Sequence, residues 1–332
     1  MLTFLAIAAA MGVAVVLGNG DAANAAGTMV ATRAASSRAA VAWSFGWHLV
    51  GGLVGGSAVA AAVAALVRVP PHRLPGVLLA GCITSIVFTR WSARRGLPVS
   101  ASHALFAGLA GAAVVMGGWH AVKWGGLSGW RPTGMAAVVA ALVLSPVVGL
   151  MMAAVVRTAF GRVAAGLPRR AARSVRAAIW ASAAAVAVAD GGNDGQKAMG
   201  VMAAALAVDT PHMTSGVPFW VRSVAAVGLA AGTAIGGQRV LRSVSRKLYH
   251  MDLIDGVAVQ VSSAAVILAG SALAAPLSTS TVVASSVLGA GATRRPAHVR
   301  WGLATQMVRA WLVTVPVCLA MGAGLAAAGQ AL

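Results

Sequence analysis

Two short polar motifs interrupt stretches that are otherwise apolar enough to cross a membrane. The first runs from Gly18 to Gly27 and contains Asp21 and Asn24. A charged side chain at membrane depth costs roughly 2.5 to 3.5 kcal/mol on insertion scales, and glycine weakens a helix by about 1 kcal/mol. Unwound backbone at that depth is tolerated only where it lines a cavity or is buried in protein. We therefore expect a broken helix whose carbonyls and carboxylate can hold a cation.

The same chemistry returns between residues 191 and 200, where the polar side chains are Asn193, Asp194, Gln196 and Lys197. We expect another broken helix here. An unpaired ammonium is expensive at membrane depth, so we expect Lys197 to pair with Asp194. A glycine-rich patch for helix packing is the alternative for either motif alone. The occurrence of two copies favours a binding site.

A second pair of motifs begins with proline and continues with hydroxyl side chains. One runs from Pro98 to His103 and the other from Pro276 to Thr281. This order is typical of a helix start, and the first amides of a helix bind phosphate or sulfate readily. Ordinary capping would explain one copy. From two copies we expect two helix N-termini that face each other across an anion site, with the hydroxyls of Ser100, Ser102, Ser278, Thr279 and Ser280.

The two motif pairs indicate an internal repeat. Asp194 follows Asp21 by 173 positions, and Ser278 follows Ser100 by 178. Two pairs in the same order at nearly the same offset are hard to obtain by chance. Five expected crossings separate the copies, and because five is odd the second half enters the membrane upside down. This is the inverted-repeat plan of many secondary transporters.

The composition places the chain in a membrane. Of its 332 residues, 59% are hydrophobic and 9% are charged, which leaves too little charged surface for a soluble domain. The formal net charge is +19. Such an excess can indicate nucleic-acid binding, but here the basic residues lie between apolar stretches of spanning length. The positive-inside rule therefore explains the charge better, and no nucleic-acid partner is expected.

We predict an all-α polytopic membrane protein with about ten crossing segments, each near the roughly 20 residues that a bilayer requires. The segments are 2–32, 41–66, 76–92, 98–118, 133–156, 177–208, 219–237, 252–272, 277–292 and 301–328. They group into a first repeat (1–156), a basic cytoplasmic connecting loop (157–176) and a second, inverted repeat (177–332). Whether 98–118 and 277–292 cross fully or are re-entrant stays open.

The basic residues predict the orientation. With the N-terminus outside, 18 basic residues fall in inner loops and 4 in outer loops, including six arginines between Arg157 and Arg176 on the inside. We therefore expect a multi-pass protein of a bacterial plasma membrane. The apolar stretch after Met1 resembles a signal peptide, but no basic region precedes it, and the polar motif that ends it recurs later.

In the order and spacing of these motifs the chain resembles the inorganic phosphate transporter (PiT) family. That family's signature has Gly-Ala-Asn-Asp followed by Val-Ala-Asn-Ala in the first half and by Gln-Lys in the second, with Pro-Val-Ser-Thr-Thr-His downstream in each. The resemblance covers essentially the whole chain, including residues 236–239 and 301–316. It implies that the substrate site is formed by Asp21, Asn24, Ser100, Ser102, Asn193, Asp194, Gln196, Lys197, Ser278, Thr279 and Ser280.

Several positions depart from the family pattern. Gly20 stands where the family has asparagine, Ala101 replaces a hydroxyl residue, and Thr281 replaces the usual histidine. His48 and Gln260 stand in place of glutamates, and the chain has no glutamate at all. Few hard oxygen ligands therefore remain for sodium. A proton requires only titratable groups, and the coupling-ion candidates are Asp21, Asp194 and His103.

The resemblance implies a secondary active transporter that imports inorganic phosphate by alternating access, and the departures favour proton symport. The alternatives are a sulfate permease of the same family and a sodium-coupled phosphate symporter. We expect no cofactor, but a co-transported proton or sodium, or a metal–phosphate complex; no metal site is assigned, and a homodimer stays open. A channel should show a continuous polar stripe, and an enzyme should show a nucleophile beside a base or a metal cluster. Neither pattern is present in the sequence.

Overall fold

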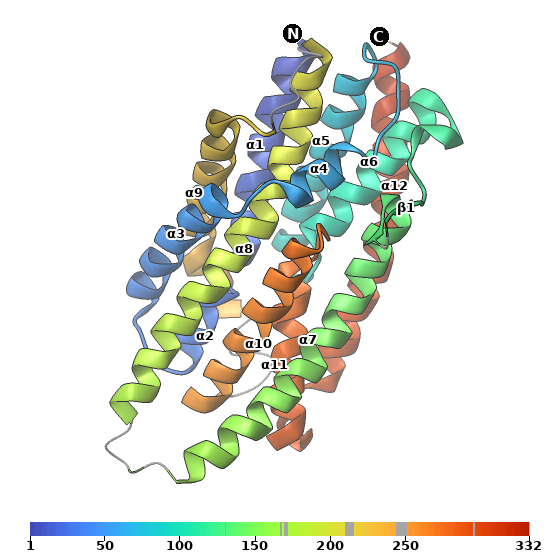
Figure 1. Cartoon of the computed structure of the whole chain (residues 1–332). Helices are drawn as coiled ribbons and strands as arrows, with labels where there is room; N and C mark the ends of the chain where they lie inside the picture. Colours follow the sequence, from blue (N-terminus) through green and yellow to red (C-terminus); the bar gives the residue numbers. More distant parts are fainter. Residues whose placement is uncertain are drawn as a thin grey trace.

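The computed structural model describes residues 1–129, 131–166, 168, 172–209, 216–243, 251–294 and 296–331; at 128, 131, 209, 237–243, 298 and 303 it describes the backbone alone. Within these ranges the chain is almost entirely helical (Figure 1), apart from a two-stranded hairpin of β1 (Leu127–Ser128) and β2 (Arg131–Pro132). Both chain ends lie at the same end of the molecule. The α-helices are α1 (Leu2–Asp21), α2 (Ala25–Ala31), α3 (Ser37–Val54), α4 (Ala58–Ala64), α5 (Leu74–Arg94), α6 (Ala101–Gly117), α7 (Gly134–Ala165), α8 (Ala172–Asp209), α9 (Phe219–Ser243), α10 (Leu253–Ala272), α11 (Thr279–Arg294) and α12 (Trp301–Ala331).

Each of the ten expected segments contains a helix, but ten full crossings are not confirmed. By length and composition, seven helical stretches in the described residues can span a membrane; the first of these joins α1 and α2. An eighth is obtained if α3 and α4, bent by 71° at a short break, count as one span. The helices of the two segments left open, α6 and α11, have only 17 and 16 residues.

These two short helices belong to helical hairpins whose turns meet. α5 and α6 form one hairpin, α10 and α11 form the other, and the Oγ atoms of Ser100 and Ser278 lie 2.9 Å apart where the turns touch. Ten full crossings would place these two turns on opposite surfaces, about 30 Å apart. A direct contact between them is incompatible with that arrangement. The two hairpins therefore do not both cross the membrane in full, and their meeting turns are the arrangement expected of re-entrant hairpins.

The first glycine-rich motif breaks its helix as expected. α1 ends at Asp21, a turn of three residues follows, and Asn24 stands at the N-cap of α2. This break places the Asp21 carboxylate and the Asn24 amide side by side, with the Asn24 side chain donating to Asp21 Oδ1 at 3.1 Å.

The expectation of a second broken helix was wrong, because α8 runs without interruption from Ala172 to Asp209. The glycines of the second motif serve close packing. A Cβ on Gly191 would lie 2.4 Å from the carbonyl oxygen of His48 on α3, and one on Gly192 would lie 3.4 Å from the Gly55 Cα atom. Small residues of this kind let two helix backbones approach each other within a membrane. The motif therefore brings α3 against α8 instead of unwinding α8.

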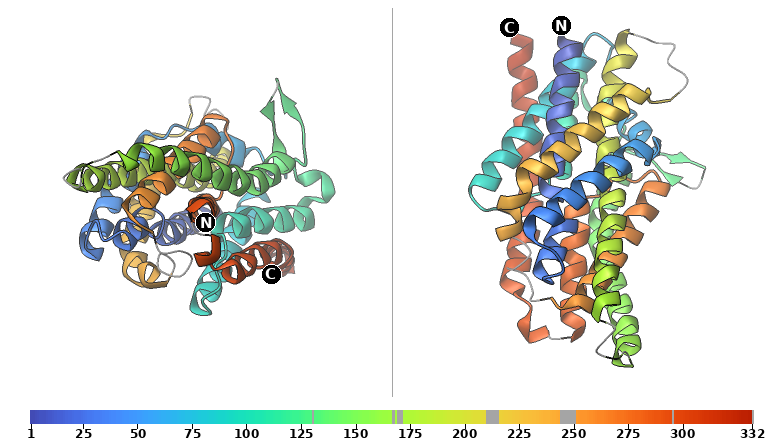
Figure 2. Two further views of the ribbon diagram at one scale, coloured as in Figure 1. Left: turned by 90° about the horizontal axis from the view of Figure 1, so that it is seen from below. Right: turned by 90° about the vertical axis from the view of Figure 1, so that its left-hand side faces the viewer.

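Close helix crossings also join the two halves of the chain (Figure 2). The first half's α6 packs against α12, and the second half's α11 packs against α7. A Cβ on Gly111 of α6 would lie 2.0 Å from the Leu319 carbonyl oxygen, and one on Gly289 of α11 would lie 2.1 Å from that of Leu150. Each hairpin is thus fixed to a long helix from the other half. α1 with α9 and α3 with α8 make further contacts across the halves.

The stretch predicted as the connecting loop is largely helical at its two ends. α7 continues to Ala165 and α8 begins at Ala172, so about six residues separate the two helices.

Arg157 near the end of α7 pairs with Asp255 of α10, and Arg294 of α11 reaches the same carboxylate at 3.1 Å. Five of the basic residues predicted to face inward lie outside the described residues: Arg169, Arg170, Arg246, Lys247 and Arg295.

Candidate substrate site

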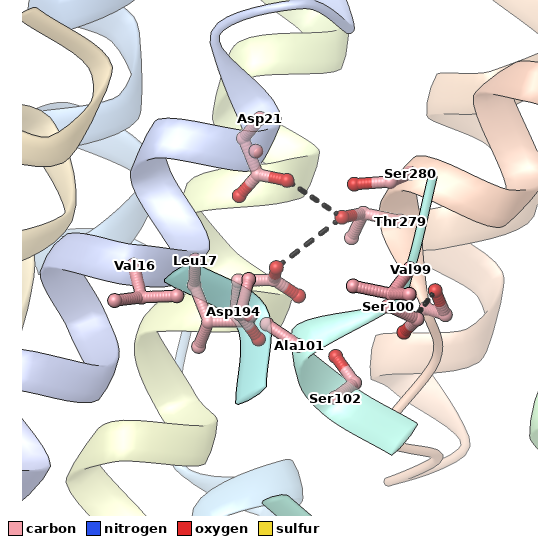
Figure 3. A pocket seen from close by; sticks show the side chains of 13 residues that line it. Val16, Leu17, Asp21, Val99, Ser100, Ala101, Ser102, Asp194, Thr279 and Ser280 are labelled. Carbon is pink, nitrogen blue, oxygen red and sulfur yellow. Dashed lines mark hydrogen bonds between the residues drawn. The ribbon is translucent and has the colours of Figure 1, made fainter. Parts of the chain in front are cut away.

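A cavity of about 40 Å³ lies where the two hairpin turns meet α1 and α8 (Figure 3). The charged groups at its wall are Asp21 from α1 and Asp194 from α8, 1% and 2% exposed. The cavity therefore has an acidic wall and a hydroxyl-rich wall. The full lining is Val16, Leu17, Gly20, Asp21, Thr89, Val99, Ser100, Ala101, Ser102, Asp194, Ser278, Thr279 and Ser280.

Thr279 connects the two carboxylates. Its Oγ1 lies 2.9 Å from Asp21 Oδ1 and 3.2 Å from Asp194 Oδ2, and Figure 3 shows it between them. Thr279 is the first residue of α11, so its position is set by the start of that helix. The equivalent position of the first hairpin is Ala101, which has no hydroxyl. Only the second hairpin can therefore join the two acidic groups in this way.

Each short helix starts at the cavity, whose lining includes Ala101 and Ser102 of α6 and Thr279 and Ser280 of α11. Ser100 is the N-cap of α6, and its Oγ accepts from the backbone N–H of His103 at 3.3 Å. Ser278 precedes α11, and its carbonyl accepts from the N–H groups of Thr281 and Val282. The first amides of a helix have no partner within the helix and carry partial positive charge. Two such ends beside one cavity form a site for an oxyanion.

Lys197 connects the acidic wall to both hairpins. Its ammonium is fully buried and donates to Asp194 Oδ1, to the Leu277 carbonyl oxygen and, at 2.8 Å, to Ser102 Oγ. The expected pairing with Asp194 is therefore present. Ser102 comes from the first hairpin and Leu277 from the second. One buried cation thus holds both turns against α8.

The centre of the molecule is short of positive charge. Asp21, Asp190 and Asp194 are buried together, and Lys197 is the one buried lysine or arginine among the side chains that the structure describes. Two like charges about 4 Å apart repel by roughly 4 kcal/mol at an effective dielectric constant of about 20. An anion can therefore bind beside these carboxylates only if protons or cations accompany it.

Besides Asn24 and Lys197, three predicted site residues do not line the cavity. The Gln196 amide accepts from Val59 N at 2.8 Å and donates to Gly55 O at 2.7 Å, so it fixes the bend between α3 and α4. Asn193 donates to Ser271 Oγ and Ala275 O at the α10–α11 turn.

His103 is the third of these residues. It is buried behind the cavity, and its Nδ1 has no hydrogen-bond partner among the described residues.

Two residues that the sequence did not assign to the site, His48 and Asp190, lie next to Asn24. The Asn24 amide donates to Asp190 Oδ2 at 2.9 Å, and His48 Nε2 lies 3.8 Å from the same oxygen. Both side chains are fully buried. For Asp190 the signal in the sequence is an aspartate inside an apolar segment, four residues before Asp194.

Comparison with known proteins agrees with this geometry. The chain is 30% identical to a "Probable low-affinity inorganic phosphate transporter" of Bacillus subtilis (strain 168) over 331 residues, which cover 97% of this chain and 96% of that protein. It is 39% identical over 251 residues to a protein of the same description from Mycobacterium tuberculosis (strain ATCC 25618 / H37Rv), covering 74% of this chain and 58% of that one.

A solved structure described as "The sodium-dependent phosphate transporter" has the same fold. It aligns with a TM-score of 0.84 and 21% identity over all of this chain and 99% of its own. The relatives named here are transporters rather than enzymes, and the bacterial ones indicate that this multi-span chain belongs in a plasma membrane. A family model for phosphate transporters (PHO4) matches residues 17–322. The chain is therefore a member of the phosphate transporter family.

Proposed function

We propose that this protein imports inorganic phosphate together with protons, by alternating access to the cavity between the two hairpin turns. The observation that carries the proposal is the convergence of two helix N-termini on a cavity with two buried carboxylates. Family membership supports phosphate as the substrate. The coupling to protons rests on the chemistry of the side chains.

The carboxylates favour phosphate over sulfate. Phosphate near neutral pH still carries a proton, because its second ionisation has a pKa near 6 to 7. A P–OH group can therefore donate to Asp21 Oδ2, which has no hydrogen-bond partner among the described residues. Sulfate carries no proton at that pH and would place bare oxygens against Asp21 and Asp194. A sulfate permease is the alternative that this argument disfavours.

The charge balance favours co-transport of positive charge. Three buried carboxylates face one buried ammonium before any anion enters. Protons on the carboxylates or on phosphate would reduce this excess. Sodium would need a cage of oxygens, and the chain has no glutamate to contribute one. The name of the solved structure above keeps sodium coupling as the second candidate.

We further propose that residues 1–156 and 177–332 are inverted repeats and that the N-terminus lies outside. The paired contacts of α6 with α12 and of α11 with α7 support the repeat. The excess of basic residues around the α7–α8 connection supports a cytoplasmic position for that end. The phosphate site then lies between two re-entrant turns, one from each side of the membrane.

Uptake of radiolabelled phosphate by proteoliposomes tests the function. We expect an inward proton gradient to drive accumulation at fixed external pH, with sodium replaced by choline. Unlabelled phosphate should compete, and an equal concentration of sulfate should not. Protein-free liposomes give the background. Competition by sulfate as strong as by phosphate would contradict the substrate, and a large loss of rate without sodium would contradict proton coupling.

A further inference from the structure

We propose that His48 and Asp190 form the site that holds the coupling proton. The pair lies behind the substrate cavity and does not line it. This inference rests on the proposed phosphate transport and assigns the proton to particular side chains. It assigns the proton to a pair that includes neither His103 nor Asp194.

The pair lies at the crossing of three helices and is closed to solvent. His48 is on α3, Asp190 is on α8, and Thr233 of α9 covers the far side of the imidazole ring, with its Oγ1 3.0 Å from His48 Nδ1. All three side chains are 0% exposed. Gly191 allows this approach, since a Cβ there would meet the backbone of His48.

The hydrogen bonds leave a place for one proton. Thr233 has one hydroxyl hydrogen and three acceptors within reach: Gly18 O, Leu229 O and His48 Nδ1. When it donates to a carbonyl, Nδ1–H donates to the hydroxyl, and Nε2 then carries a lone pair. That atom lies 3.8 Å from Asp190 Oδ2, and neither Nε2 nor Asp190 Oδ1 has a hydrogen-bond partner in the described part of the chain. A proton on Nε2 makes the ring a cation beside the Asp190 carboxylate, an ion pair at 3.8 Å that a small shift of either side chain would close to a hydrogen bond.

The pair is connected to the substrate cavity by one amide. Asn24 Nδ2 donates both to Asp190 Oδ2, at 2.9 Å, and to Asp21 Oδ1, at 3.1 Å. Asp21 lines the cavity, so the charge on Asp190 and the charge beside the anion share one donor group. Protonation of the pair removes negative charge next to the cavity in which the anion must bind. Binding of the proton and binding of phosphate therefore favour each other.

The surrounding charges agree with a proton as the occupant. The charged groups that face the pair are Asp21 from α1, with Asp194 and its partner Lys197 from α8; α9 contributes the neutral Thr233 and the start of α2 the neutral Asn24. The environment is therefore acidic in balance. A hard cation such as sodium prefers oxygen ligands to an imidazole nitrogen.

The test uses the full-length protein in proteoliposomes that contain a pH-sensitive dye. Phosphate/phosphate exchange without a gradient measures substrate handling, and phosphate-driven acidification of the lumen measures proton movement. We expect His48→Gln and Asp190→Asn to keep exchange while proton movement falls at least about tenfold, since a hydrogen bond to a charged group is worth roughly that much. Asp190→Glu keeps the carboxylate and should keep proton movement. His120→Gln, at an exposed histidine, is the matched control.

The outcomes separate this inference from the proposed function. Wild-type protein without phosphate exchange would overturn the function itself. Normal exchange and normal proton movement in His48→Gln and Asp190→Asn would overturn only the proton site, as would equal loss in Asp190→Glu and Asp190→Asn. If a variant loses exchange as well, phosphate binding in detergent is measured against pH. An unchanged pH dependence contradicts the proposal, and a flattened one supports it. Loss of transport with a chelator, reversed by a divalent metal, would identify a metal site instead.

Discussion

At the scale of single residues, the site depends on one hydroxyl that faces two carboxylates. Thr279 is close to both Asp21 and Asp194, and both acids are buried. Hydrogen bonds to charged acceptors contribute roughly 1.5 to 3 kcal/mol each. The geometry of the site is therefore set by a side chain with a single hydrogen to donate.

We predict that Thr279→Val lowers phosphate uptake at least about tenfold, because the isosteric side chain keeps the volume and loses the donor. Thr279→Ser keeps the hydroxyl and should stay close to wild type. The measurement is initial uptake rate at matched amounts of protein in the membrane. Equal rates for the valine and serine variants would show that the bridge is dispensable.

The two acidic residues should differ in their effect on stability. Asp21→Asn and Asp194→Asn should each remove most transport. Only Asp194→Asn leaves the buried Lys197 ammonium without its partner, which costs roughly 3 to 5 kcal/mol for a buried pair. Thermal unfolding in detergent should therefore show a large loss for Asp194→Asn and a small one for Asp21→Asn. The double variant Asp194→Asn with Lys197→Met should recover stability without recovering transport. A double variant as unstable as the single one would argue against this assignment.

Most of the polar residues that line the cavity could be identified from the sequence, since polar groups within apolar segments stand out by type and spacing. Asp21, Asp194 and Thr279 meet as the repeated motifs indicated. His48 and Gln196 could not be assigned correctly, because their roles depend on which helix crosses which. The position of a residue along a helix determines on which face of the helix its side chain lies. The sequence does not say which other helix packs against that face.

At the scale of helices, glycines decide where backbones touch and where they unwind. Composition does not separate these roles, since one glycine-rich segment breaks at Asp21 and the other stays helical through Gly191 to Gly200. Likewise, α6 and α11 lie in segments that were marked as crossings, but they have only 17 and 16 residues and begin at the two turns that meet. Apolar length alone therefore predicted ten crossings, a number that the helices do not confirm.

The crossing of α6 and α12 offers a matched test of close packing. A Cβ on Gly322 would lie 2.2 Å from the Gly108 carbonyl oxygen, whereas nothing lies within 4 Å of a Cβ on Gly324. We expect Gly322→Ala to destabilise the protein by roughly 1 to 3 kcal/mol, as overpacking does. Gly324→Ala should leave stability unchanged or raise it, because alanine favours a helix. Melting temperatures in detergent that fall equally for both would contradict a specific backbone contact.

At the scale of the whole molecule, both chain ends lie at one end of the bundle, and the end of α7 and the start of α8 lie at the other (Figure 1). The two native cysteines, Cys82 and Cys318, are fully buried and should not react with impermeant reagents. Orientation can therefore be measured in the otherwise unmodified chain.

We predict that a cysteine in place of exposed His120 reacts with an impermeant maleimide in intact cells, while one in place of exposed Arg162 reacts only after the membrane is opened. The reason is the excess of basic residues near Arg162, which retains that end in the cytoplasm. The reverse pattern of labelling would invert the proposed topology. Wild-type protein provides the background.

The fastening of α6 to α12 and of α11 to α7 has a consequence for biosynthesis. α6 and α7 are made before these partners exist, since α11 and α12 come later in the chain. The face of α6 that carries Gly111 stays without its partner until α12 has been made. We therefore expect the first half to complete its packing only after the second half is in the membrane, and a chain truncated before Trp301 should leave this face of α6 open.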